Sequence, residues 1–332
     1  MKRILVMCCF ALLFSCGKKQ SPDVSFYYWK TAFRLSAAEK EILSKNEVSK
    51  LYVRYFDVAL VDNKPFPIAP VRFVENPKNY RIVPVVFIKN EVFLSRDISL
   101  EKLAGHVLQL IRQIDQANTI QNTEIQIDCD WSLNSRDNFM EFLRILKKKY
   151  PKTISATIRL HQVKYFKETK VPPVDYGVLM FYNMGKLGDG ESNSIYDPAI
   201  AKRYLPSLKE YPLKLKVALP VFSWIVHTRN HKIVNLISKI EMEKFSHNLN
   251  FEPTGDNVLR VKENTLCEGF FFKEGDQLKA EKITPEDLHE MSRLLKANLS
   301  QKPDEIIYYD LDNNNIKRIQ DEYFFKANSA NF

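Results

Sequence analysis

The sequence predicts a (β/α)₈ barrel, in which eight parallel strands alternate with helices around a closed core. Eight short strand-like stretches follow one another over residues 25–328, and stretches with helical periodicity separate most of them. A length of 332 residues suits one domain of this kind. A doubly wound sheet ranks lower, because no glycine-rich phosphate turn follows any of the strands.

The expected strands are rich in β-branched and aromatic residues. They cover residues 25–30, 50–56, 83–88, 124–130, 153–160, 175–182, 214–222 and 305–311. Helical periodicity covers residues 36–46, 99–118, 135–149, 197–210, 284–299 and 313–326. In 99–118, Leu103, Val107 and Leu110 fall on one face, and Thr284 precedes Pro285 as an N-cap residue.

Two connections depart from the alternating pattern. Residues 57–82 contain four prolines, at 65, 67, 70 and 77, and no helix fits there. Residues 225–283 are too long for one loop and helix, so we expect an insertion after strand seven. It should hold a helix over 233–244 and a small β element around CEGFFFKEG at 267–275. An insertion at this point lies on the barrel face that usually carries the active site.

The first sixteen residues resemble a bacterial lipoprotein signal. Lys2 and Arg3 precede an apolar run over 4–14, which is too short to span a bilayer, and the stretch LLFSC ends at Cys16. The resemblance implies that Cys16 carries the lipid, with a palmitate-type chain, and that residues 17–24 form a tether to a domain over 25–328. The protein would then be anchored to a membrane of the bacterial cell envelope. An ordinary secretory signal that is cut nearby is the alternative.

Composition and charge exclude several classes of function. The formal net charge is +9, but the basic residues are spread along the chain, and LKKKY at 146–150 fits the solvated end of a helix. An exported chain without a basic and aromatic motif is not expected to bind nucleic acid. No Cys and His spacing fits a metal site, since HTRNH at 227–231 lacks a third ligand nearby, and we expect no cofactor.

The fourth expected strand, EIQIDCDWS, places polar and apolar residues on opposite faces. Asp128 and Asp130 share the polar face, which we expect to point into the barrel. By the same alternation Arg54, Arg159 and Asp310 also point inward. Buried charges need partners, so we predict an ion pair of Asp128 with Arg54 or Arg159. Asp130 lies nearer to the carboxyl end of its strand and is the candidate catalytic residue.

Aromatic residues near the strand ends predict a carbohydrate ligand. Trp29 and Trp224 could stack on the apolar face of a sugar ring, although burial in the core is the alternative for each. Trp131 has outward parity and should pack against a helix. Tyr182 could donate a hydrogen bond to a sugar or hold Asp130 in place.

The motif over 128–132 resembles the Asp-x-Asp-x-Glu motif of chitinase-like glycoside hydrolases of family eighteen. Met180 and Tyr182 match that family on strand six, and ALPVF at 218–222 matches it on strand seven. Ser132 stands where the family has its catalytic Glu, and a serine hydroxyl cannot act as a general acid near neutral pH. The chain also looks like a family of uncharacterised bacterial lipoproteins with a QIDxD strand, which implies no known activity.

These observations predict an exported protein that binds or hydrolyses a carbohydrate. The substrate-assisted chitinase route should fail without the Glu, whereas a mechanism that uses Asp130 and Asp310 as two carboxylates, with Tyr182 beside them, stays open. A structural or assembly lipoprotein with a degenerate site is the alternative. The expected substrate-binding residues are Trp29, Arg54, Asp128, Arg159 and Trp224.

Overall fold

The computed structural model describes residues 21–188 and 192–332. The expected signal, Cys16 and residues 17–20 of the expected tether lie outside the described residues, so their roles stay predictions. Over the described ranges, none of the helices has the length and apolar character needed to cross a membrane.

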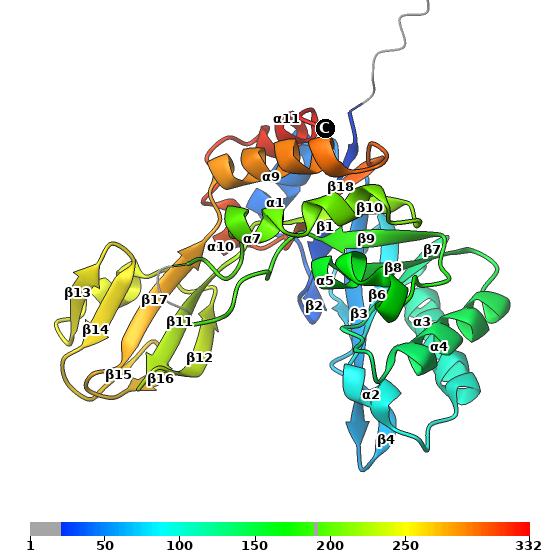
Figure 1. Cartoon of the computed structure of the whole chain (residues 1–332), viewed down its shortest axis with the longest axis horizontal. Coiled ribbons are helices and arrows are strands. Elements are labelled where there is room, and N and C mark those ends of the chain that lie inside the picture. The colour runs from blue at the N-terminus through cyan, green and yellow to red at the C-terminus, as the bar shows by residue number, and fades with distance from the viewer. Residues whose placement is uncertain (1–20, 189–191) are drawn as a thin grey trace, which may run out of the picture.

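Eight parallel strands form a closed barrel, which confirms the predicted fold class (Figure 1). Each strand pairs with its neighbour in chain order, and pairing of the first strand with both the second and the last closes the ring. All eight strands were expected at these places. They are β1 (Asp23–Tyr28), β3 (Lys50–Val61), β6 (Arg81–Ile88), β7 (Glu124–Asp128), β8 (Thr153–Arg159), β9 (Tyr176–Met180), β10 (Leu215–Pro220) and β18 (Glu305–Tyr309).

Helices surround the barrel. Capping boxes mark the starts of two expected helices: Ser36 caps the helix over Ala37–Lys45, and Thr284 caps the helix over Pro285–Asn298, as predicted for Thr284. The expected helices 197–210 and 313–326 are each broken into two short pieces. The elements are α1 (Ala37–Lys45), α2 (Asn90–Leu94), α3 (Leu100–Asn118), α4 (Arg136–Lys149), α5 (Leu160–Lys164), α6 (Phe166–Thr169), α7 (Pro198–Lys202), the 3₁₀ helix η1 (Leu205–Lys209), α9 (Pro285–Asn298), α10 (Asn313–Ile316) and α11 (Phe324–Ser329).

The connection between β3 and β6 contains strands in place of a helix. The strand β4 (Lys64–Ile68) folds back antiparallel on the end of β3, and β5 (Arg72–Phe73) pairs with β2 (Ala32–Phe33). The prolines of this segment agree with that arrangement, because each one removes a donor that a helix would need.

The insertion after the seventh barrel strand is a small antiparallel sheet that lies beside the barrel (Figure 1). It has a hydrophobic core of its own, which includes Ile225, Phe251 and Phe272. Its elements are β11 (Ser223–Arg229), β12 (Lys232–Ser238), α8 (Glu243–Ser246), β13 (Phe251–Gly255), β14 (Val258–Val261), β15 (Thr265–Cys267), β16 (Phe270–Phe272) and β17 (Gln277–Lys282).

The helix expected over 233–244 is wrong, because this stretch begins with the strand β12. Asn230 and His231 both have positive φ, which gives the two-residue turn that joins β11 and β12 as a hairpin. The β element expected around 267–275 is confirmed as the hairpin of β15 and β16, with Glu268 and Gly269 at its turn.

The amino-terminal end of the barrel interior holds a buried charge network that we did not predict. The carboxylate of Glu305 accepts hydrogen bonds from Lys50 at 2.5 Å, from Lys216 at 2.7 Å and from the hydroxyl of Tyr52 at 3.1 Å. Burial opposes ionisation of Glu305, but the two lysines outweigh it and hold its pKa below the usual value. The network therefore closes the floor of the barrel with paired charges.

Candidate functional site

A row of aromatic rings crosses the mouth of the barrel at the carboxyl ends of the strands. It runs from Trp29 to Tyr309 at 5.5 Å between ring centroids, then to Tyr182 at 5.6 Å, with the two tyrosines stacked at 22°. It continues to Phe222 at 5.8 Å and ends at Trp224 after a further 5.2 Å. Both tryptophans are half-buried, so each end of this aromatic row is accessible.

Asp128 lies below the row and forms no ion pair with Arg54 or Arg159, so that prediction is wrong. Its Oδ1 accepts a hydrogen bond from the Thr157 hydroxyl at 2.6 Å. Burial raises the pKa of Asp128 to about 7, the hydrogen bond from Thr157 opposes this rise, and the charge of Asp130 adds to it. Asp128 is therefore a carboxyl group that exchanges its proton near neutral pH.

Asp130 pairs with Arg159 through two parallel hydrogen bonds. Arg159 donates from Nη2 to Oδ2 at 2.7 Å and from Nε to Oδ1. The side chains are 33% and 43% exposed, which places this pair at the open surface of the mouth. The side chain of Gln162 accepts from the backbone N–H of Arg159 at 2.8 Å and so fixes the start of α5. The carboxylate of Asp130 is thus already engaged at both oxygens.

Arg54 pairs with Asp57, three residues further along the same strand. Its Nε donates to Oδ1 and its Nη2 contacts Oδ2, both at 2.7 Å. A bulge in the pairing of β3 with β6 between Arg54 and Phe56 allows this contact, because it changes the alternation of the strand. Phe56, two residues beyond Arg54, accordingly lines a groove outside the barrel.

Three tyrosines lie near enough to Asp128 for its charge to act on them. Burial and the nearby charge of Asp128 raise the pKa of Tyr27, Tyr182 and Tyr309 well above the usual value. These phenols therefore stay protonated at physiological pH and can donate hydrogen bonds. The hydroxyl of Tyr27 donates to Gln126 at 2.7 Å, deeper in the barrel.

Asp310 belongs to a different cluster from Asp130. Its Oδ1 accepts from Asn315 at 2.6 Å, and the charged groups acting on it are Lys239, Asp312 and Lys30. Burial raises the pKa of Asp310 to about 6. The inward position at the end of β18 is taken by Tyr309, so the expected inward parity of Asp310 is wrong. The structure does not bring Asp130 and Asp310 together as a facing pair.

Trp131 and Ser132 continue the chain after the two acids. Trp131 is buried and stacks on Phe139 of α4 at 4.8 Å, and its indole N–H donates to the carbonyl of Thr169. Its outward packing is therefore confirmed. Ser132 is exposed, and its hydroxyl accepts from the side chain of Asn90 at 3.3 Å.

Glu281 of the insertion fixes Trp224, a role that the sequence did not reveal. Its Oε2 accepts from the indole Nε1 of Trp224 at 2.8 Å and from the backbone N–H of Ser194 at 3.1 Å. Lys279 contacts the other oxygen at 3.0 Å. No sequence motif surrounds Glu281, so the only available signal was a single acid within a strand-like stretch.

The described residues contain no group of three His, Cys, Asp or Glu side chains that could hold a metal ion. His227 of the HTRNH stretch is fully buried, and its Nε2 contacts the carboxylate of Asp276 at 2.8 Å. This histidine therefore has a structural partner inside the insertion.

Comparisons with known proteins give one consistent result. No family model and no curated protein matches the sequence. Among solved structures, a chitinase from Chromobacterium violaceum has a TM-score of 0.56 at 11% identity and covers 93% of this chain and 99% of its own. A chitinase from Bacteroides thetaiotaomicron has a TM-score of 0.56 at 13% identity, over 94% and 96%.

A GH18 chitinase from Cycas revoluta, solved with (GlcNAc)₄, has a TM-score of 0.52 at 11% identity over 93% of this chain and 99% of its own. At such identities these likenesses show the fold alone. The chain has the same kind of barrel as the GH18 chitinases.

Proposed function

We propose that the mouth of the barrel binds a carbohydrate chain along the aromatic row. The observation that carries this proposal is the unbroken series of rings from Trp29 to Trp224, with an accessible tryptophan at each end. Sugar rings have flat apolar faces that stack on aromatic side chains, and their hydroxyls need polar partners beside those rings. The exposed Asp130 and Arg159 offer such partners at the same opening.

We further propose that the site binds its ligand without the substrate-assisted hydrolysis of the chitinase family. The resemblance over 128–132 aligns Ser132 with the general acid, and a serine cannot supply that proton. Asp130, which aligns with the acid that orients the substrate, is held by two hydrogen bonds from Arg159. Of the two groups that this route requires, the general acid is thus missing and the orienting acid is engaged by Arg159.

The experiment is a binding and cleavage screen with the full chain carrying Cys16→Ser. Chito-oligosaccharides come first, since a structural neighbour was solved with one, and other bacterial and host glycans follow. We expect saturable binding without new reducing ends. Trp29→Ala and Trp224→Ala should each weaken binding about tenfold, because an aromatic stack contributes about 0.5–1.5 kcal/mol beyond the area it buries.

Phe271→Ala is the matched control, because Phe271 is 54% exposed on β16 of the insertion and lies outside the aromatic row. The glycan affinity of Phe271→Ala should equal that of the parent protein. Cleavage that disappears in Asp130→Asn would show a hydrolase and contradict the second proposal. A folded protein that binds none of the glycans would instead favour the structural role.

We also propose that the chain is exported and held at a membrane of the bacterial cell envelope through a lipid on Cys16. The basic start, the short apolar run and the LLFSC sequence support this. The test is incorporation of labelled palmitate into the protein in the producing bacterium. Cys16→Ser should lose the label and leave the membrane fraction, whereas Cys9→Ser should keep both. Equal labelling of the two variants would refute the anchor.

A further inference from the structure

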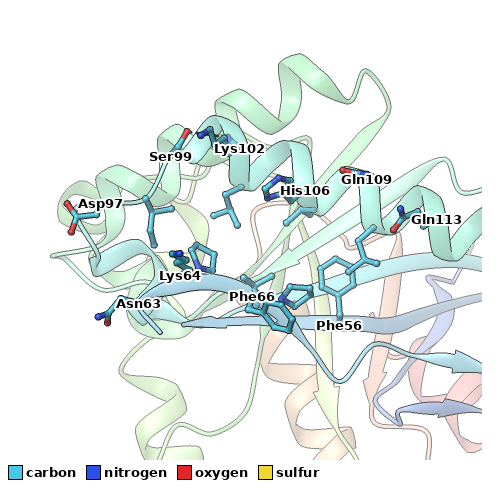
Figure 2. A pocket seen from close by; sticks show the side chains of 17 residues that line it. Phe56, Asn63, Lys64, Phe66, Asp97, Ser99, Lys102, His106, Gln109 and Gln113 are labelled. Atoms are coloured by element: carbon cyan, nitrogen blue, oxygen red, sulfur yellow. Dashed lines mark hydrogen bonds between the residues drawn. The ribbon is translucent and has the colours of Figure 1, made fainter. Parts of the chain in front are cut away.

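A groove of about 710 Å³ lies outside the barrel (Figure 2). It runs between the hairpin of β3 and β4 on one side and α3 on the other. The groove exists because the connection from β3 to β6 has no helix in its described residues, so α3 lacks the helical neighbour that the barrel pattern would place there.

The groove has apolar side chains on both walls, and polar side chains of α3, among them His106, line it as well. Phe56 and Val58 line it from β3, and Leu103 lines it from α3. Phe66 and Pro67 of β4 form the opposite lip, and Phe66 is 56% exposed. A groove of this size, in which apolar walls lie beside polar side chains, can hold a small ligand that has both an apolar and a polar part.

The charges of the groove are collected at one end. Lys64 and Lys102 stand where α3 begins, together with Asp97, whereas the other end carries the neutral side chains Gln109 and Gln113 (Figure 2). Both lysines are exposed, and among the described residues neither forms an ion pair. The lining of α3 from Ser99 to Gln113 corresponds to about 20 Å at 1.5 Å per residue.

We propose that this groove binds a free long-chain fatty acid, with its carboxylate between Lys64 and Lys102 and its chain along α3. An apolar channel with cations at one end matches a ligand with one anionic group and a long hydrocarbon chain. Burial of the hydrocarbon chain against the apolar walls supplies the affinity.

An added strand fits this place less well. Pro65 and Pro67 occupy alternate positions of β4, which is the edge strand of the sheet, and proline has no N–H to donate to a neighbour. The groove is also distinct from the aromatic row, because its lining residues come from β3, β4, α3 and the short segments beside them and include none of the row.

The experiment is a titration of the full chain carrying Cys16→Ser with palmitate, below the concentration at which palmitate aggregates, followed by calorimetry. We expect one saturable site. Lys64→Ala together with Lys102→Ala should weaken binding at least tenfold, because it removes both cations that face the carboxylate. Gln109→Trp, which places a large ring in the groove, should abolish binding.

Two matched variants serve as controls. Lys148→Ala together with Lys302→Ala removes two exposed lysines elsewhere, and Gln116→Trp adds the same ring to α3 at an exposed position outside the groove. Both should bind palmitate like the parent protein. Thermal unfolding of every variant shows whether it is folded, and an unchanged glycan affinity in Gln109→Trp would separate this site from the mouth.

Three ligands with the same chain length and different head groups show whether the groove selects an anion. Hexadecanol should bind more weakly than palmitate and hexadecyltrimethylammonium should bind weakest, because only palmitate carries the anion. Absence of saturable palmitate binding, full binding by Gln109→Trp, or equal affinity for the cationic amphiphile would each overturn the proposal. Binding to vesicles of anionic phospholipid, without binding of the free fatty acid, would assign the groove to a bilayer surface and overturn it too.

Discussion

Replacing Asp128 by asparagine should stabilise the protein above neutral pH and have little effect in acid. Burial raises the pKa of Asp128 from 3.8 to about 7 in the folded state, and the unfolded chain keeps the ordinary value. Between these values the folded state holds a proton that the unfolded chain has lost, so the carboxylate destabilises the fold as pH rises. At about 1.4 kcal/mol per pKa unit, the full cost above pH 7 is about 4 kcal/mol.

Asparagine keeps the oxygen that accepts from Thr157 and carries no charge, so it removes this cost while the barrel packing stays the same. The assay is urea unfolding of the parent and the variant from pH 4 to pH 8.5. The stability gain of the variant should be close to zero at pH 4, rise through pH 7 and then level off. A difference that does not change with pH, or that favours the parent at pH 8, would refute the role of burial.

Three further predictions concern buried partners. Lys216→Met should cost about 3–5 kcal/mol in urea unfolding, because it removes one of the two cations that compensate the buried charge of Glu305. Trp131→Ala should cost about 3–5 kcal/mol by the same measurement while glycan affinity stays unchanged in the folded fraction, since this side chain packs outside the barrel. Asp276→Ala should raise the hydrogen-exchange rates of β11–β17 more than those of the barrel strands. The change removes the carboxylate that contacts buried His227 inside the insertion.

The fold was predictable because its elements carry local signals. Each barrel strand is a compact β-branched or aromatic stretch, and Ser36 and Thr284 mark helix starts through side chains that bond the first turn. The position of the insertion after the seventh barrel strand was predictable, whereas its secondary structure was predicted only in part. The turn at Asn230 and His231 depends on two residues with positive φ, and neither is glycine, so the usual hairpin signal was absent.

The location of the site at the mouth of the barrel was predictable, whereas the pairing of its acidic and basic side chains was not. Alternation along β7 and β8 placed Asp128 and Arg159 on the inward faces of their strands, where Asp128 meets Thr157 and Arg159 meets Asp130 at the mouth. It could not show which acid meets which base, because the partner depends on the register between neighbouring strands. The bulge in β3 shows the same limit, since one irregular step gave Arg54 a partner on its own strand.

The pairing of Asp130 with Arg159 changes the argument about function. Ser132 removes a general acid only if the resemblance assigns its position correctly. The pairing with Arg159 does not depend on the resemblance. Its two hydrogen bonds engage Asp130 whether or not the motif is related to that of the chitinases. Asp128, left with hydroxyl groups as neighbours, becomes a carboxyl group that is easily neutralised. Ser132 and the Asp130–Arg159 pair thus bear independently on the two groups of the chitinase-type route, whereas the aromatic row stays open at Trp29 and Trp224 for the binding that we propose.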